Sequence, residues 1–142
     1  MKAVLPLVLM LMSLNLYGQN TKFHLLSGKW IAYGFKSHKD SIVKIIREDC
    51  AKEKYDFNKD GNYTQEMFCS KQHGKWAFND DSTKIGFKLT EFMGQKVEDK
   101  LPMKYHHLII KLTKDTLIIG SEGYYGNERT YGHDDSYFVR KK

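Results

Sequence analysis

Residues 28–35 read Gly-Lys-Trp-Ile-Ala-Tyr-Gly-Phe. If side chains alternate across this stretch, Trp30, Ala32 and Gly34 share one face. The bulky residues between them share the other face. A period of two over residues of this kind is typical of a β-strand. We therefore predict that the stretch forms the first strand of the domain.

The same period recurs along the rest of the chain, most clearly at Ile85, Phe87 and Leu89. An apolar run over residues 42–46 is expected to follow the first strand as the second. In all, about eight or nine short strands are expected, joined by turns of Asp, Asn, Gly and Ser. The predicted fold is all-β, an antiparallel up-and-down barrel or half-open barrel, because closure removes unpaired edges. A short helical turn is expected over residues 21–26.

The N-terminal segment has the pattern of a signal peptide. Lys2 supplies a positive charge, residues 3–16 are almost wholly apolar, and Gly18 is a small residue before the expected cleavage point. The apolar run is shorter than the roughly 20 residues that span a bilayer, and an uncleaved anchor is the alternative. We expect residues 1–19 to be removed and residues 20–142 to form one barrel domain. That domain would be exported, periplasmic or secreted, without a transmembrane span.

The chain contains two cysteines, Cys50 and Cys69. In an exported protein such a pair indicates a disulfide, and no third cysteine competes for it. The closed loop would stabilise the fold by roughly 3 kcal/mol in the chain-entropy account. Two free thiols are the alternative.

The formal net charge is +6 at pH 7, and basic and acidic residues are mixed along the chain. A nucleic-acid-binding surface needs a basic stripe interleaved with exposed aromatic residues. No such stripe is evident in the sequence, so nucleic acid is not an expected partner. A monomer is expected.

Several short motifs occur in a definite order. The domain opens with Leu26-x-Gly28-x-Trp30, and the motif Gly-x-Trp returns at residues 74–76. Between the two copies, the two cysteines flank an aromatic-rich hairpin with an Asp-Gly turn at residues 60–61. A late hairpin reads Leu-Thr-Lys-Asp-Thr-Leu over residues 112–117. Over about residues 25–120, this order resembles the bacterial lipocalin-like domains of secreted proteins, which are calycin-like β-barrels.

The resemblance implies an antiparallel barrel that can contain a ligand cavity, and it implies no shared catalytic residues. In lipocalins an arginine near the end of the last strand packs across the tryptophan of the first strand. Here the resemblance assigns that role to Arg140, with Arg129 as the alternative.

Metal binding and catalysis find little support in the sequence. Residues 56–64 match the first half of a calcium-binding loop, but Met67 stands where the loop needs a bidentate Glu. A hairpin turn over Asn58–Gly61 explains the same residues. His106 and His107 are adjacent and would point to opposite faces of a strand, so they cannot share one ion. We expect no metal, no cofactor and no enzymatic activity.

The most plausible function is the binding of a small apolar or amphipathic ligand inside the barrel. Burial of apolar surface would supply the affinity, and a few polar groups would orient the ligand. The candidate wall residues are Trp30, Phe57, Tyr63, Trp76, Phe87 and Ile110. Tyr124 and Tyr125 lie in a Gly- and Tyr-rich stretch that is expected to form a loop over the cavity. The alternative is an envelope or secreted protein-interaction or inhibitor domain, with a filled core and no ligand.

Overall fold

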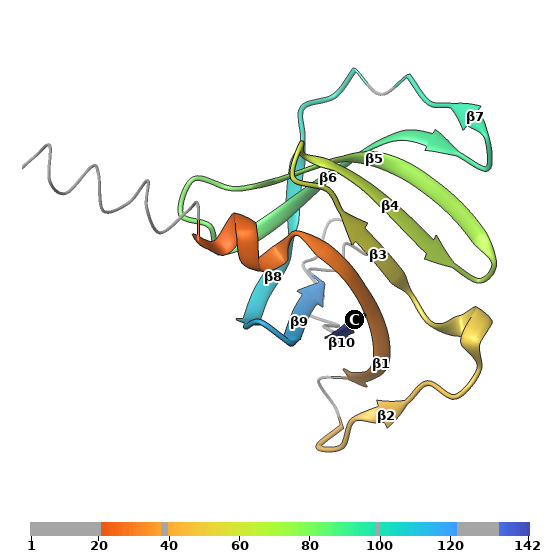
Figure 1. Cartoon of the computed structure of the whole chain (residues 1–142), viewed down its shortest axis with the longest axis vertical. Helices are drawn as coiled ribbons and strands as arrows, with labels where there is room; N and C mark the ends of the chain where they lie inside the picture. The colour runs from red at the N-terminus through yellow and green to blue at the C-terminus, as the bar shows by residue number, and fades with distance from the viewer. Residues whose placement is uncertain (1–20, 38–39, 99, 122–133) are drawn as a thin grey trace, which may run out of the picture.

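The computed structural model describes residues 21–37, 40–98, 100–121 and 134–142 (Figure 1). Its strands form a closed antiparallel eight-stranded β-barrel with two additional strands, which confirms the predicted fold class. The strands are β1 (Gly28–Ser37), β2 (Lys44–Ile45), β3 (Lys54–Phe57), β4 (Asn62–Met67), β5 (Ser70–Phe78), β6 (Lys84–Phe92), β7 (Gln95–Lys96), β8 (Lys104–Leu112), β9 (Thr116–Ser121) and β10 (Asp134–Arg140).

Helix is scarce in the described ranges. A helical segment covers residues 21–26, as expected, and a single 3-10 turn, η1, covers Asp49–Ala51. No helix in these ranges is both long enough and apolar enough to cross a membrane. The expected signal peptide over residues 1–19 lies outside the described residues.

The barrel wall is made of strands that mostly pair with their neighbours along the chain. The path runs β1-β3-β4-β5-β6-β8-β9-β10 and then returns to β1. β1 pairs with β3 over Gly28–Ile31, and it pairs with β10 from Trp30 to Ser37. Because the path returns to its start, β1 and β10 each have a partner on both edges, and the wall closes.

The apolar run over residues 42–46 does not form the full strand that the sequence predicts. Only Lys44 and Ile45 pair there, with Phe35 and Gly34 of β1. β3 already occupies the same edge of β1 nearer its start, so β2 is limited to the remaining end. The side chains of β2 consequently stay outside the core, where Ile45 is 61% exposed. Of the apolar run, Ile46 packs against the core.

Aromatic side chains dominate the core. β3 places Tyr55 and Phe57 inward, and their rings stack at a centroid distance of 5.0 Å. The fully or nearly fully buried hydrophobic residues are Leu26, Trp30, Ala32, Tyr55, Phe57, Tyr63, Trp76, Ile85, Leu117, Ile119 and Phe138. The inward positions of the first strand and of β6 follow the alternation seen in the sequence.

Trp30 and Arg140 meet at one end of the barrel. The Arg140 guanidinium carbon lies 4.3 Å from the centroid of the Trp30 ring, within range for a cation–π contact. Arg140 also donates hydrogen bonds to the carbonyl oxygens of Ser27 at 2.7 Å and Lys114 at 2.6 Å, and to that of Leu25. The role that the resemblance assigns to Arg140 is therefore confirmed.

The conformation of the residues before β1 fits the contact between Trp30 and Arg140. The Trp30 indole Nε1 donates to the Leu26 carbonyl at 2.7 Å, which ties the end of the helical segment to the core. Gly28 has φ +124°, and a β-carbon there would collide with the Arg140 guanidinium. Glycine is required at this position both for its backbone angle and for the space.

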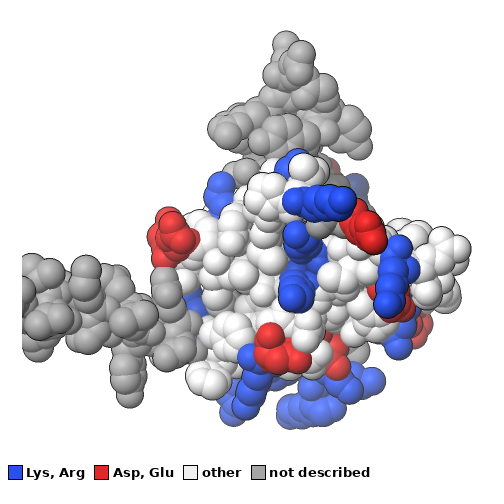
Figure 2. All heavy atoms as spheres, turned by 90° about the horizontal axis from the view of Figure 1, so that it is seen from above, with Lys and Arg blue, Asp and Glu red and all other residues white. Residues whose placement is uncertain are grey.

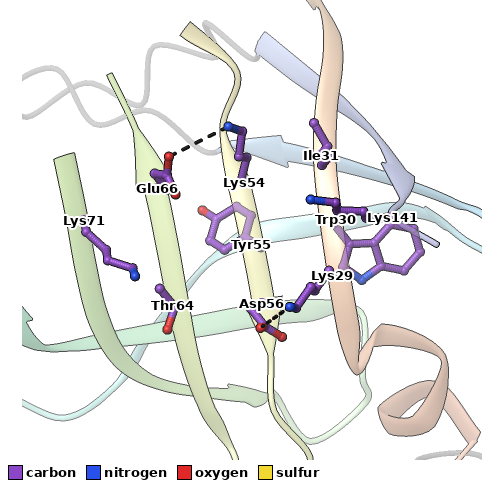
Figure 3. A pocket seen from close by; sticks show the side chains of 10 residues that line it. All are labelled: Lys29, Trp30, Ile31, Lys54, Tyr55, Asp56, Thr64, Glu66, Lys71 and Lys141. Atoms are coloured by element: carbon purple, nitrogen blue, oxygen red, sulfur yellow. Dashed lines mark ion pairs between the residues drawn. The ribbon is translucent and has the colours of Figure 1, made fainter. Parts of the chain in front are cut away.

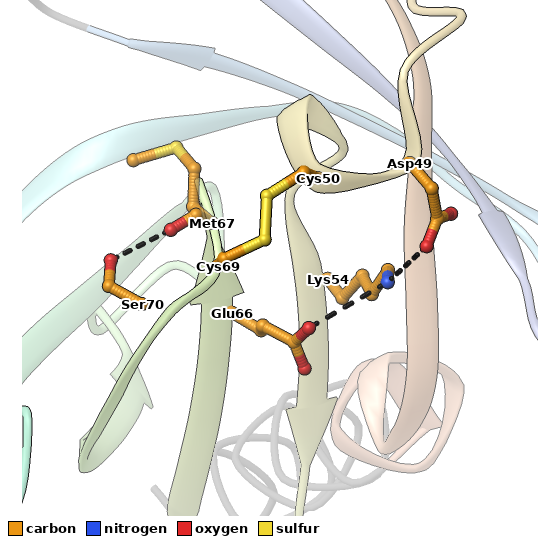
Figure 4. The surroundings of a disulfide bond; sticks show 7 residues. All are labelled: Asp49, Cys50, Lys54, Glu66, Met67, Cys69 and Ser70. Atoms are coloured by element: carbon orange, nitrogen blue, oxygen red, sulfur yellow. Dashed lines mark hydrogen bonds and ion pairs between the residues drawn. A yellow bond between two sulfur atoms is a disulfide. The ribbon is translucent and has the colours of Figure 1, made fainter.

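A disulfide joins Cys50 of η1 to Cys69 in the β4–β5 turn (Figure 4), as the sequence predicts. The two Cα atoms are 5.4 Å apart, and 19 positions separate the residues in sequence. Beside the bond, Lys54 pairs with Asp49 at 3.0 Å. The disulfide therefore holds the start of β3 against the tip of the adjacent hairpin.

The Asn58–Gly61 segment forms the predicted turn between β3 and β4. Gly61 has φ +83° and donates its backbone N–H to Asn58 O at 3.1 Å. Asp60 accepts the backbone N–H of Asn62 at 2.9 Å. Hydrogen bonding to Asn62 lowers the pKa of the Asp60 carboxyl. Asp60, one of the two acidic residues of the calcium-like motif, therefore stabilises the turn.

We predict that Arg140→Met lowers the free energy of unfolding by about 2–4 kcal/mol, because it leaves three carbonyl groups without their charged donor. Met retains much of the apolar stem, so packing against Trp30 is largely kept. Urea unfolding followed by tryptophan fluorescence measures the change. The matched control is Lys142→Ala at an exposed position, and equal stability of the two variants would contradict the role of Arg140.

Candidate functional site

The barrel has two different ends. The end where β1 begins and β10 finishes carries Trp30 and Arg140, and we call it the proximal end. Neighbouring strands run in opposite directions, so the β4–β5 turn and the β6–β7 turn both lie at the opposite, distal end. Trp30, Arg140 and the helical segment pack together at the proximal end. A hollow of about 310 Å³ also lies at this end, between Phe23 of the helical segment and the residues from Trp76 to Ser82.

Five of the candidate wall residues gather inside the barrel. Trp30, Phe57, Tyr63 and Trp76 are buried in one cluster, and Phe87 is partly buried against it. The Phe57 and Trp76 rings lie 5.4 Å apart, and the Tyr63 and Phe87 rings lie 4.9 Å apart. Most of these side chains pack against one another as core residues, and Phe87 is the least enclosed of them.

The remaining candidates lie elsewhere. Ile110 is 48% exposed, because the pairing of β8 with β9 is irregular between Ile109 and Lys111. Ile109, and not Ile110, packs against the core. Tyr124 and Tyr125 lie outside the described residues.

A chain of polar side chains continues the core toward the distal end. Gln72 donates its side-chain amide to Gln65, and Gln65 donates to the Glu53 carboxylate. The Tyr55 hydroxyl also hydrogen-bonds to Glu53. The Glu53 carboxylate is thus bonded to the Gln65 amide and to the Tyr55 phenol, and Gln72 holds the Gln65 amide in place. These bonds satisfy much of the hydrogen-bonding capacity of the carboxylate.

Burial raises the pKa values of Glu53 and of two neighbouring tyrosines. Desolvation raises the pKa of the Glu53 carboxyl above its usual range, although hydrogen bonds from Tyr55 and Gln65 oppose the effect. Desolvation and the nearby Glu53 raise the pKa of Tyr55 well above that of a free phenol. Desolvation raises the pKa of Tyr63 to about 12. Both phenols are therefore neutral at physiological pH.

His107 is the other polar residue among the aromatic rings. Its ring lies 4.8 Å from Phe87, edge to face, and its Nδ1 atom is buried and has no hydrogen-bond partner among the residues that the structure describes. Desolvation, assisted by the nearby His106, lowers the pKa of His107 to about 4. The imidazole is therefore neutral at pH 7, with an unused polar atom inside the protein.

A hollow of about 230 Å³ lies beside this histidine, where β6 and β8 separate at the distal end. Phe87 and His107 line its inner wall, and Leu101, Pro102, Lys104 and His106 complete the lining. Aromatic core, unpartnered imidazole and surface lysine therefore meet in one place. The volume is slightly below the roughly 300–1,000 Å³ of most small-ligand sites.

A second hollow, of about 280 Å³, lies on the outer face of β1, β3 and β4 (Figure 3). Two ion pairs cross it, Lys29–Asp56 and Lys54–Glu66, each at 3.8 Å. The lining also includes Lys71 and Lys141. Exposed pairs of this kind contribute little to stability. This groove is lined mainly by charged residues, whereas the hollow beside His107 is partly apolar.

Charges elsewhere on the surface are mixed. On the face seen in Figure 2, Lys and Arg side chains form several separate groups, most with Asp or Glu nearby. Such a distribution does not build a field of one sign over that face. In the described part of the chain, no group of three or more His, Cys, Asp or Glu is placed to hold a metal ion.

The fold is an all-β antiparallel barrel of eight strands, consistent with a calycin-like architecture. No protein-family model matches the chain, and a search of curated proteins finds no significant match. The likeness to lipocalin-like domains therefore rests on the motifs and on the Trp30–Arg140 contact.

Sequence reasoning missed four residues of the distal interior, Glu53, Gln65, Gln72 and His107. A signal was present for three of them. Glu53 has the same parity as Tyr55 and Phe57, Gln65 has that of Tyr63, and Gln72 has that of Trp76. His107 has the parity of Ile109, but residues 108–110 are all apolar, so the sequence does not show which face of this strand is the inner one.

We predict that His107 makes the protein less stable in mild acid. The unfolded imidazole binds a proton below about pH 6.5, but the folded one does so only below about 4. The free energy of unfolding should therefore fall by up to about 3 kcal/mol as the pH drops through this window.

Denaturant unfolding of the wild type and of His107→Leu at several pH values isolates this effect. Glu53, whose pKa is raised, acts in the opposite direction and is common to both proteins. The stability of the wild type relative to the variant should decline between pH 6.5 and 4. A constant difference across that range would show that the folded imidazole titrates normally.

Proposed function

We propose that this protein is a lipocalin-like binding module that holds a small apolar or amphipathic ligand, and that it is not an enzyme. The observation that carries the proposal is the hollow beside Phe87, where the buried Nδ1 of His107 has no partner. Ligand sites are mostly apolar, with a few polar groups that set the orientation. The Phe87 ring, Leu101 and Pro102 supply the apolar part, and His107 supplies an orienting group.

The rest of the barrel supports this site. Phe87 stacks against Tyr55 at 5.5 Å, so the wall of the hollow is backed by the core. Trp30 and Arg140 pack together at the proximal end, and the hollow beside His107 lies toward the distal side. A rigid wall reduces the ordering cost of binding, which favours affinity for a small ligand.

We also propose that the protein is exported and acts in the periplasm or outside the cell. The Cys50–Cys69 disulfide is typical of an oxidising compartment. Residues 1–19 have the composition of a removable signal peptide.

Native and denaturing mass spectrometry of the protein, purified from its own cells, tests the ligand and the export together. A small molecule that is retained in the native spectrum and lost on denaturation is the expected result. Loss of residues 1–19 from the measured mass would support export. If no molecule is retained and none binds from a panel of lipophiles, the carrier function is wrong.

We predict that Leu101→Asp weakens binding of the neutral probe N-phenyl-1-naphthylamine by about tenfold, because a carboxylate in the apolar lining must be desolvated. Fluorescence titration measures the affinity. Leu108→Asp is the matched control, since Leu108 is exposed on the same sheet but does not line the hollow. Equal weakening by both variants would place the probe elsewhere.

A second candidate function, a protein-interaction domain, is favoured by two apolar turns at the distal end. Phe68 and Met93 have φ values of 49° and 50°, and they are 69% and 67% exposed. Each is the first of two consecutive left-handed residues, the arrangement in which Asn-Gly is preferred. Large apolar residues are thus kept exposed at positions that local conformation disfavours, which is a feature of binding surfaces.

We predict that Phe68→Asn combined with Met93→Asn stabilises the isolated protein by about 1 kcal/mol, because Asn tolerates the left-handed region better. Thermal unfolding measures the gain. Phe92→Asn is the control, since Phe92 lies in β6 and is also largely exposed. No gain in the double variant would remove the conformational argument for a binding role of these turns.

A further inference from the structure

We propose that the hollow between β6 and β8 binds the anionic head group of a small amphipathic ligand, in the first place a carboxylate. This inference rests on the proposed function and adds the chemical class of the ligand. It follows from the side chains of the lining, from the position of Lys104, and from the unused polar atom of His107.

Among the described residues, the lining contains basic side chains and no acidic ones. Lys104, His106 and His107 are basic, and Phe87, Leu101 and Pro102 are apolar. The outer groove, in contrast, contains Asp56 and Glu66 among its lysines. In the described part of the chain, the hollow beside His107 therefore combines a cation with an apolar wall and includes no carboxylate.

Lys104 is placed to act as the cation. It pairs with Phe87 across β6 and β8, which brings its backbone next to the inner wall of the hollow. Its side chain is exposed, and no ion pair to it occurs among the described residues. A carboxylate in the hollow would give this lysine a charge-assisted partner at a site partly shielded from water.

His107 supplies a second contact from the inner side. A neutral imidazole carries one N–H donor, and the proton can sit on Nδ1. Nδ1 is buried and has no hydrogen-bond partner among the described residues, so a bond to a ligand oxygen, made after a rotation of the ring toward the hollow, would replace none in the free protein. An unmade bond at a buried polar atom is costly, so its formation adds to the affinity.

A cationic head group fits the site less well. It would lie beside Lys104, and none of the described residues of the lining is acidic and able to balance the charge. Glu53, the buried carboxyl inside the barrel, does not line the hollow and already accepts hydrogen bonds from Tyr55 and Gln65. A neutral alcohol could bond to His107 but would leave Lys104 without a counter-charge.

Competition with N-phenyl-1-naphthylamine tests the head group, with decanoate, decanol and decyltrimethylammonium as ligands of equal chain length. Wild-type protein should bind decanoate about tenfold more tightly than decanol, and the ammonium most weakly. Lys104→Met should reduce the preference for decanoate over decanol to about twofold or less. Lys111→Met, at an exposed position of the same strand outside the hollow, should behave as wild type.

The side-chain NMR signals of His107 give an independent readout that does not depend on a variant. Decanoate should shift the imidazole resonances of His107 more than those of His24 and His73, which lie outside the lining. Shifts confined to His24 and His73 would overturn the assignment of the site.

The failure of this inference differs from the failure of the proposed function. If decanol or the ammonium binds as tightly as decanoate, the carboxylate assignment is wrong, although the barrel still binds a ligand. An equal loss of preference in Lys104→Met and Lys111→Met would show a general charge effect and would also overturn the assignment. If none of the three ligands displaces the probe or binds directly, the carrier function fails, and this inference fails with it.

Discussion

The packing of Arg140 on Trp30 is the contact on which the rest of the barrel depends. One guanidinium covers the ring and ties three backbone carbonyls together, two before β1 and one before β9. These groups come from opposite ends of the domain and from the β8–β9 turn. The contact that joins the first and last strands of the wall therefore also covers the proximal end of the barrel. Gly28 leaves the space that the Arg140 guanidinium occupies.

With one end filled in this way, the interior changes character along the barrel axis. The aromatic layer around Tyr55 and Phe87 gives way to the Glu53–Gln65–Gln72 chain on one side and to His107 on the other. The first group is internally satisfied and stiffens the wall. The second retains an unpaired atom beside a hollow. This difference in hydrogen bonding, more than the count of aromatic residues, indicates which part of the interior can take a ligand.

The predictable part of this structure is the part with local periodicity. Alternation places Trp30 and Ala32 on the inner face of β1, and the turn at Asn58–Gly61 follows from its residue types. Gly34 leaves this face, because the pairing of β1 with β10 is irregular between Ala32 and Gly34. Irregular pairing explains why other positions were not predictable. The irregularity near Ile110 leaves Ile109, and not Ile110, facing the core, and His107 lies inward because it pairs with the buried Ile85. Residues 42–46 are apolar enough for a core strand, but β3 already occupies most of that edge of β1, and no local pattern records such competition.

The position of β10 has a consequence for how the domain is made. The strand that closes the wall follows all the others along the chain, and it pairs with the first one. During synthesis from the N-terminus, one edge of β1 and one edge of β9 stay unpaired until β10 has been made. Contacts that join distant parts of a chain form slowly, and unpaired edges promote aggregation. The incomplete barrel is therefore most prone to aggregation just before its closing strand pairs.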